Sequence, residues 1–202
     1  PAGDYPDGIA YGPNVNKIYV SDLHGKTDTV VDAKTNQRIT TIALGGGAGN
    51  TQYDSVSEHI FVTVHGQNQL AEIDPTKDQV IARYALAGCS EPHGLLIDSE
   101  HRLAFVACEE NAKLAVFDLE AKKMTAIHSV GADPDVVEQP LDGARRCEAV
   151  GNPDEPHRRR SAPHDRFHGR GRARVRDADA RARHRDDVAR VAASPSRRRR
   201  GF

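Results

Sequence analysis

Carboxylate and imidazole side chains are the groups in this sequence that are best suited to bind or transform a ligand. Together they could transfer protons, bind a divalent cation or hold a positively charged group. The candidates come from three similar segments of the chain and are Asp7, His24, His65, His93, Glu109 and Asp135. The alternative interpretation is that they are separate polar residues on solvated loops.

The spacing of these residues restricts their chemistry. Residues 1–137 contain no close His-x-His or His-x-x-x-His pair, so a metal site would need ligands from separate segments. There is no nucleophile elbow and no recognisable pair of catalytic carboxylates. The glycine-rich stretch 45–50 lacks the Lys-Ser/Thr and the helix that a phosphate loop requires. We therefore predict no catalytic residue, no metal and no cofactor.

Cys89 and Cys108 are a second feature with possible chemistry. They lie 19 residues apart and bracket a predicted two-strand hairpin, which could bring them within disulfide range. Their spacing leaves three alternatives open: a disulfide, two free thiols or a pair of metal ligands. A disulfide would indicate an oxidising compartment and therefore a periplasmic or extracellular location.

The elements that must position these groups form a repeat. Tyr19 in the run IYV returns as Phe61 in IFV and as Phe105 in AFV, 42 and then 44 residues later. The first unit contains four short β-type runs, GIAY, KIYVSD, DTVVD and RITTIAL. This period and four strands per unit are typical of a β-propeller blade. We predict an all-β partial propeller of three four-stranded antiparallel blades at about residues 6–47, 48–90 and 91–137.

Aspartates at the third turn of each unit recur with the same spacing, at Asp32, Asp74 and Asp118. An Asp at the start of a turn can accept hydrogen bonds from backbone N–H groups two residues on. We interpret these three residues as structural. Valine, isoleucine, leucine and aromatic side chains should be buried between neighbouring blades.

The repeat also predicts where the candidate residues lie. Asp7, His93 and Asp135 occupy nearly the same place in their units, so they should face one rim of the central channel. The loops that carry the other three candidates should lie on that rim as well.

The three units resemble the YVTN-type β-propeller repeat family. The matching residues are Pro6-Asp7-Gly8, Ile18-Tyr19-Val20-Ser21 and Val30-Val31-Asp32, with looser starts at Pro92-His93-Gly94 and Pro134-Asp135. The resemblance covers about residues 6–137 and implies a fold rather than an activity, because the motif residues serve packing and turns. It also implies a seven-bladed ring, so we expect this chain to be a fragment. Related propellers carry a similar cysteine pair around a Pro-x-Gly start.

The composition changes near residue 137. Residues 1–137 contain 10 Lys and Arg and 19 Asp and Glu, a net charge of −9, whereas residues 138–202 contain 18 and 10, a net charge of +8. Only seven of these last 65 residues are large and apolar, so the segment is predicted to be mostly disordered. Its excess of Arg and Ala is also what an out-of-frame reading of a GC-rich gene gives, and we expect a frameshift between residues 137 and 147. The sequence shows no apolar run long enough to span a bilayer and no signal-peptide pattern.

These features predict a non-catalytic binding scaffold that presents its loops at a central funnel to a protein or a small ligand. One alternative is a metal-dependent lactonase-like propeller enzyme whose site lies mostly in other blades. A second alternative is nucleic-acid binding through the Arg-rich segment. The negative charge of the blades themselves opposes binding of a polyanion.

Overall fold

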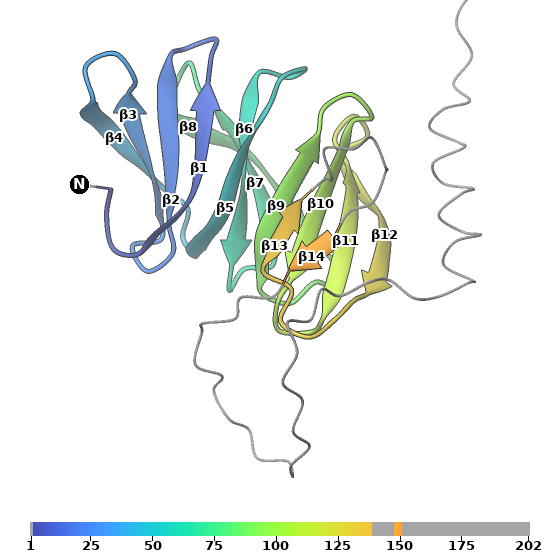
Figure 1. Ribbon diagram of the computed structural model, residues 1–202. Coiled ribbons are helices and arrows are strands. Elements are labelled where there is room, and N and C mark those ends of the chain that lie inside the picture. The colour runs from blue at the N-terminus through green and yellow to red at the C-terminus, as the bar shows by residue number, and fades with distance from the viewer. Residues whose placement is uncertain (1, 139–147, 151–202) are drawn as a thin grey trace, which may run out of the picture.

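The computed structural model describes residues 2–138 and 148–150, which form three four-stranded antiparallel sheets and one two-stranded sheet (Figure 1). Blade 1 contains β1 (Pro6–Gly12), β2 (Lys17–Asp22), β3 (Thr27–Asp32) and β4 (Gln37–Ala43). Blade 2 contains β5 (Gly47–Asp54), β6 (His59–His65), β7 (Gln69–Asp74) and β8 (Gln79–Ala85). Blade 3 contains β9 (Pro92–Asp98), β10 (Leu103–Cys108), β11 (Lys113–Asp118) and β12 (Lys123–Ser129). The predictions of a disordered or frameshifted tail and of its nucleic-acid binding fall almost entirely outside the described residues.

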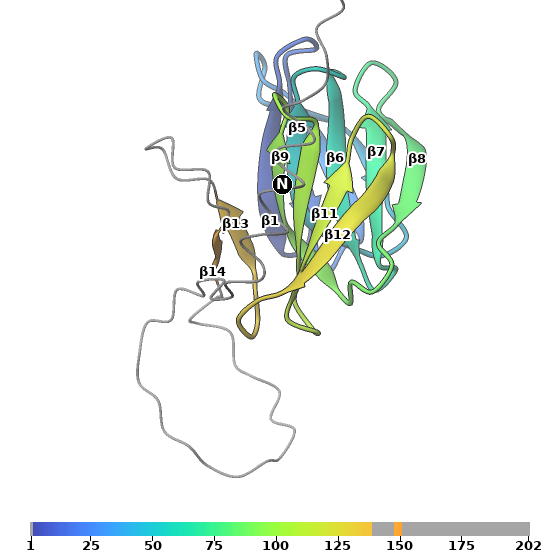
Figure 2. The ribbon, with the colours of Figure 1, turned by 90° about the vertical axis from the view of Figure 1, so that its right-hand side faces the viewer.

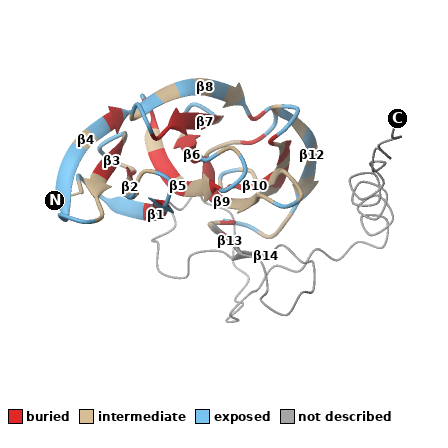
Figure 3. Ribbon diagram, turned by 90° about the horizontal axis from the view of Figure 1, so that it is seen from above, coloured by how far each residue is buried: buried red, intermediate tan, exposed pale blue. Residues whose placement is uncertain are grey.

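The three sheets stand side by side in an arc, which is visible from above (Figure 3). In each sheet the strands are paired in sequence order. β4, β8 and β12 lie along the outer side of the arc, and β1, β5 and β9 lie along its inner side. This radial arrangement of four-stranded antiparallel sheets is that of a β-propeller. The predicted all-β partial propeller of three blades is confirmed.

The third turn of each blade is built as the sequence predicts. Asp32 Oδ1 accepts hydrogen bonds of 2.8 Å from the backbone N–H groups two and three residues on, and Asp118 Oδ1 does the same. Asp74 Oδ1 accepts one such bond, of 2.9 Å, from the N–H two residues on. The residue before each outer strand has a left-handed backbone, which an Asn or Asp tolerates better than most residues; these residues are Asn36, Asp78 and Lys122.

Each blade buries an aromatic side chain against the next blade. Tyr19 and Phe61 are wholly buried, and Phe105 is 8% exposed. We call the side of a blade that carries this residue its aromatic face, and the opposite side its receiving face. Each aromatic residue shares a buried cluster with a residue of the following sheet, pairing Tyr19 with Ile60, Phe61 with Val106 and Phe105 with Val137. The core therefore lies between blades.

A fourth sheet begins after blade 3. β13 (Val136–Glu138) pairs in antiparallel register with β14 (Glu148–Val150), and the two lie on the inner side of blade 3 (Figure 2). The sequence analysis assigned residues 136 and 137 to the third unit and residues 148–150 to the Arg-rich segment. The structure instead pairs them, because Val137 packs against the aromatic face of blade 3 as the inner strand of a further unit would.

Candidate functional site

At one repeat position, the inner strands depart from the regular alternation of side chains between the two faces of the sheet. This position is Asp7 in β1, Gly49 in β5, His93 in β9 and Asp135 just before β13. In β1 the pairing with β2 is irregular between Pro6 and Ile9, and β5 and β9 show the same irregularity at the equivalent place. Such bulges redirect a side chain.

These bulges bring Asp7, His93 and Asp135 together. His93 is 8% exposed and lies between the two carboxylates. Its Nδ1 lies 2.5 Å from Asp135 Oδ1 in a hydrogen bond, and its Nε2 lies 2.8 Å from Asp7 Oδ2. The second contact is an ion pair that is not aligned as a hydrogen bond. The group, which we call the inner clasp, therefore connects blade 1, blade 3 and the start of the fourth sheet.

The charge of His93 follows from this geometry. Burial alone would lower its pKa, but the contacts and negative charges of Asp135 and Asp7 outweigh burial and raise the pKa of His93 to about 10. The ring is therefore an imidazolium at neutral pH. An imidazolium has no lone pair to accept a proton or to bind a metal ion, so His93 is suited to hold blades together rather than to act as a base.

Glycine at the blade 2 position allows the clasp to form. A Cβ at Gly49 would lie 2.9 Å from the carbonyl oxygen of His93 and 3.0 Å from its Cα. The same carbonyl accepts a hydrogen bond of 2.6 Å from Thr63 Oγ1. Because β5 has no side chain at this point, β9 approaches it closely and His93 reaches past blade 2 to Asp7.

A second group lies beside the inner clasp and joins His65 to Glu91 and Glu109. His65 Nδ1 lies 2.5 Å from Glu91 Oε2, and His65 Nε2 lies 3.6 Å from Glu109 Oε2. The His65 and His93 rings are 6.0 Å apart between centroids. The contact with His65 lowers the pKa of Glu109 although partial burial opposes the shift. We call these three residues the outer group.

Glu91 was not among the candidates from the sequence. It stands in the connection between β8 and β9, next to Pro92, where its backbone is left-handed at a φ of 53°. Its carboxylate also accepts a hydrogen bond of 2.7 Å from the backbone N–H of Gly66. The only signal in the sequence was its place two residues before His93.

His24 is placed differently from the other five candidates. Its ring packs against the ring of Tyr5 in the N-terminal segment, with centroids 4.7 Å apart. Among the described residues, no contact joins it to the inner clasp or to the outer group.

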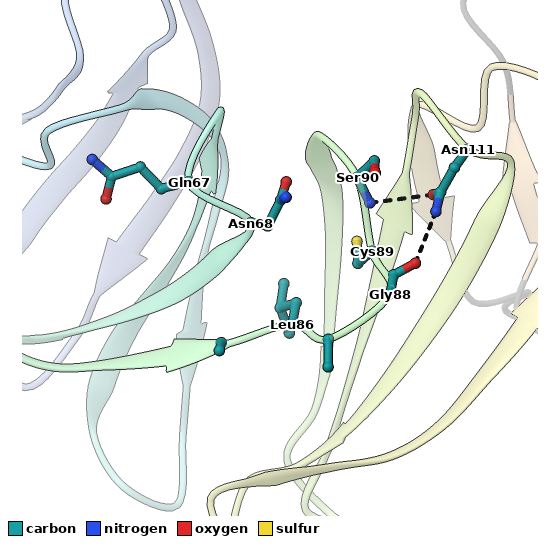
Figure 4. Close-up of a pocket in the computed structure, with 9 residues that line it drawn as sticks. Gln67, Asn68, Leu86, Gly88, Cys89, Ser90 and Asn111 are labelled. Carbon is teal, nitrogen blue, oxygen red and sulfur yellow. Dashed lines mark hydrogen bonds between the residues drawn. The ribbon is translucent and has the colours of Figure 1, made fainter.

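An open furrow lies beside Glu91, between the turns of blades 2 and 3 (Figure 4). It has a volume of about 330 Å³. Asn111 spans one wall, since it accepts a hydrogen bond from the Ser90 N–H and donates one to the Gly88 carbonyl. The lining residues are Gln67, Asn68, Ala85, Leu86, Ala87, Gly88, Cys89, Ser90 and Asn111.

Cys89 and Cys108 are joined by a disulfide, so the structure selects one of the three alternatives that the spacing left open. Their Cα atoms are 5.1 Å apart. Cys89 is in the connection that carries Glu91, and Cys108 ends β10. The bond therefore holds this connection, and with it one wall of the furrow, against blade 3.

All four ring nitrogens of His65 and His93 face carboxylates, so neither ring has a nitrogen directed at a ligand. In the described part of the chain, no set of three or more His, Cys, Asp and Glu residues is arranged to hold a metal ion. No helix within residues 2–138 and 148–150 is long and apolar enough to cross a membrane.

Comparison with known proteins supports the repeat fold. This chain is 26% identical to NHL repeat-containing protein 2 of Homo sapiens over 137 residues and of Bos taurus over 136 residues. The alignments cover 68% and 67% of this chain but only 15% of either relative. Among solved structures, Kuenenia stuttgartiensis hydrazine synthase matches with a TM-score of 0.63 and 19% identity, over 72% of this chain and 42% of that chain. At this identity the likeness shows the fold alone.

A family model also matches most of the chain. The model described as the choice-of-anchor I domain matches residues 1–142, which include every blade and the start of the fourth sheet. Since this match spans well over half of the sequence, the chain belongs to the choice-of-anchor I domain family.

Proposed function

We propose that the blades form part of a non-catalytic binding scaffold, which presents the rim around the outer group and the furrow to a protein or a small ligand. The observation that carries this proposal is that both imidazole rings at the rim are enclosed by carboxylates. Each ring nitrogen of His65 and His93 contacts a carboxylate, within 2.5 to 3.6 Å. A general base needs a free nitrogen within reach of its substrate, and these rings offer none.

The rim favours a ligand that carries positive charge. The side chains of Glu91 and Glu109 are 31% and 30% exposed, so both carboxylates remain accessible beside the furrow. The lowered pKa of Glu109 keeps it ionised at neutral pH. The net charge of −9 on residues 1–137 would attract such a ligand from a distance and repel a polyanion.

Titration of a fluorescein-labelled lysine-rich peptide, followed by anisotropy, tests this function. We expect saturable binding that weakens with salt and with Glu91→Gln or Glu109→Gln. Glu100→Gln is the matched control, because Glu100 is an exposed carboxylate in the turn between β9 and β10, at the other end of the blade. Equal affinity for a glutamate-rich peptide, or equal loss in all three variants, would contradict a rim site.

The metal-dependent lactonase-like alternative makes a different prediction. Ca²⁺ or Mn²⁺ at a built site would raise the melting temperature in a concentration-dependent way. The scaffold proposal expects no such rise in this chain.

The setting of the scaffold is also a proposal. The Cys89–Cys108 disulfide favours an oxidising compartment, and hence the periplasm or the cell exterior. The seven-bladed ring and the closer likeness to YVTN-type repeats rest on the sequence resemblance. Nucleic-acid binding by the Arg-rich segment remains a prediction from composition.

A further inference from the structure

The connection between β8 and β9 is longer than the one between β4 and β5. Gly49 follows Leu44 by five positions, whereas His93 follows Leu86 by seven, although each pair joins equivalent places of the repeat. Two residues are therefore inserted ahead of β9. Blades 1 and 2 pack together without such an insertion, so the fold itself does not require it.

The insertion changes the chemistry of this connection. It brings in Cys89, which the disulfide holds to blade 3, and it is followed by Glu91, where the preceding unit has Gly47. The brace that Asn111 provides across the connection is common to both units, since Gln67 makes the same kind of hydrogen bond at the preceding one. The disulfide and the carboxylate are thus additions to the common blade junction, which favours a role in binding over one in folding.

The wall of the furrow offers hydrogen-bond donors. All of its lining residues are uncharged, and Asn68 and Asn111 stand on opposite sides of it (Figure 4). Asn68 Oδ1 accepts a hydrogen bond of 3.0 Å from the Glu91 N–H. Among the described residues, nothing accepts a hydrogen bond from Asn68 Nδ2 or from the backbone N–H groups of Ala87 and Gly88, both of which are exposed residues. Carbonyl oxygens of an extended peptide are suitable acceptors for such donors.

Negative charge borders the same furrow. Glu91 is next in sequence to a lining residue, and Glu109 and Glu110 directly precede Asn111. His65 contacts two of these three carboxylates. Three carboxylates and one imidazole leave this border negative whether or not His65 is protonated. A cationic side chain can therefore reach the carboxylates while the main chain attached to it lies in the furrow.

We propose that the furrow and the outer group bind one extended segment of polypeptide, with a lysine or arginine side chain at Glu91 and Glu109 and the adjoining main chain along residues 87–90. This inference rests on the proposed function, whose ligand class it narrows to polypeptide. A simple amine or a polyamine could use only the carboxylates, because it has no carbonyl oxygen for the furrow donors. A peptide uses both, so it should bind more tightly than its basic residue does alone.

Two probes with the same positive charge test this inference on the full chain. One is a fluorescein-labelled pentapeptide with a single lysine flanked by glycine and serine, followed by anisotropy. The other is Nα-acetyl-lysine methylamide, used as a competitor. We expect the pentapeptide to bind at least about tenfold more tightly, since two or more hydrogen bonds to its main chain add to the ion pair.

Filling the furrow separates its contribution from that of the carboxylates. Ala85→Trp places a bulky side chain at a lining position and removes no charge. It should weaken the pentapeptide to about the affinity of the single residue and leave the inhibition constant of the single residue unchanged. Ala43→Trp is the matched control, because Ala43 is the exposed residue at the same place in β4. Equal loss of pentapeptide affinity in the two variants would overturn the inference.

A measurement on the wild-type chain covers the possibility that Ala85→Trp disturbs the fold. In NMR spectra the side-chain amide signal of Asn68 should shift when the pentapeptide is added and stay in place when the single residue is added. Equal affinity for the two probes, or an Asn68 amide that the pentapeptide leaves unshifted, would overturn the inference while the proposed function stands. Absence of saturable binding by either probe would overturn both.

Discussion

Replacement of Asp28 by leucine should stabilise the protein, and the gain should grow with pH. Asp28 is wholly buried between blades 1 and 2, and neither of its carboxyl oxygens has a hydrogen-bond partner in the described structure. Thr51 Oγ1, which is also buried, has none either. The residues at the matching positions are Leu70 and Leu95 at the next interface, which pack in its apolar cluster.

The expected gain in the free energy of unfolding from Asp28→Leu has two parts. A buried polar group without a hydrogen bond costs about 1–3 kcal/mol, which leucine should recover at every pH. The second part is the cost of ionisation. Burial raises the pKa of Asp28 from 3.8 to about 7, although polar groups of Thr51 and the Val20 backbone, which lie nearby but outside hydrogen-bond geometry, partly oppose the shift. A shift of about three units corresponds to about 4 kcal/mol.

The sign of the second part follows from proton binding. Between pH 3.8 and about 7 the folded state keeps the Asp28 proton while the unfolded state releases it. The stability contributed by the neutral carboxyl is therefore complete below pH 3.8 and is lost as the pH rises through about 7. Asp28→Leu removes this loss, so its advantage over the wild type should increase from pH 4 to pH 8 by up to about 4 kcal/mol.

Urea unfolding followed by circular dichroism, at intervals from pH 4 to pH 8, measures this difference. Asp28→Asn separates the two parts, because the amide has nearly the same shape and no charge. It should remove the pH dependence without the full gain from leucine. A difference between wild type and Asp28→Leu that stays constant over this range, or a variant less stable than the wild type at pH 8, would refute the reasoning.

Three further predictions concern contacts that join or brace the blades. The cost of His93→Gln should be largest below pH 6.5 and should fall by up to about 5 kcal/mol towards pH 10, because the folded-state pKa of His93 is raised from 6.5 to about 10 and its stabilising charge is lost as the pH rises; urea unfolding at pH 6 and pH 10 checks this. Arg102→Gln leaves Asp54, which is wholly buried, without its cation and should cost about 3 kcal/mol at pH 7 in the same assay. Replacing Cys89 and Cys108 by serine should cost about 3 kcal/mol, and a reducing agent should lower the melting temperature of the wild type to that of the variant.

The sequence was sufficient to predict the blades because their signals are local and repeat. The recurrence of Tyr19 as Phe61 and Phe105 marks the buried second strand, and the aspartates at the third turns act within three residues of themselves. Each unit thus contains the signals for its own four strands, and three such units with the same period indicate a β-propeller.

The clasp could be predicted only in outline. The repeat placed Asp7, His93 and Asp135 at equivalent positions, but the reach of His93 past blade 2 depends on Gly49, whose role appears only when the strands are packed. Glu91 belongs to the outer group, but it lies in the connection between β8 and β9, where the sequence repeat gives no indication of its role. The pairing of β13 with β14 involves too few residues to show a period in the sequence. It accompanies the packing of Val137 against blade 3.

The central claim is that His93 is charged at neutral pH and holds the blades together, and that it does not act as a base or a metal ligand. An NMR titration of its ring, assigned by comparison with His93→Gln, tests this claim most directly. The account predicts that both ring nitrogens stay protonated from pH 5 to pH 8 and that the ring titrates near pH 10. A titration near the ordinary histidine pKa of about 6.5 would contradict it.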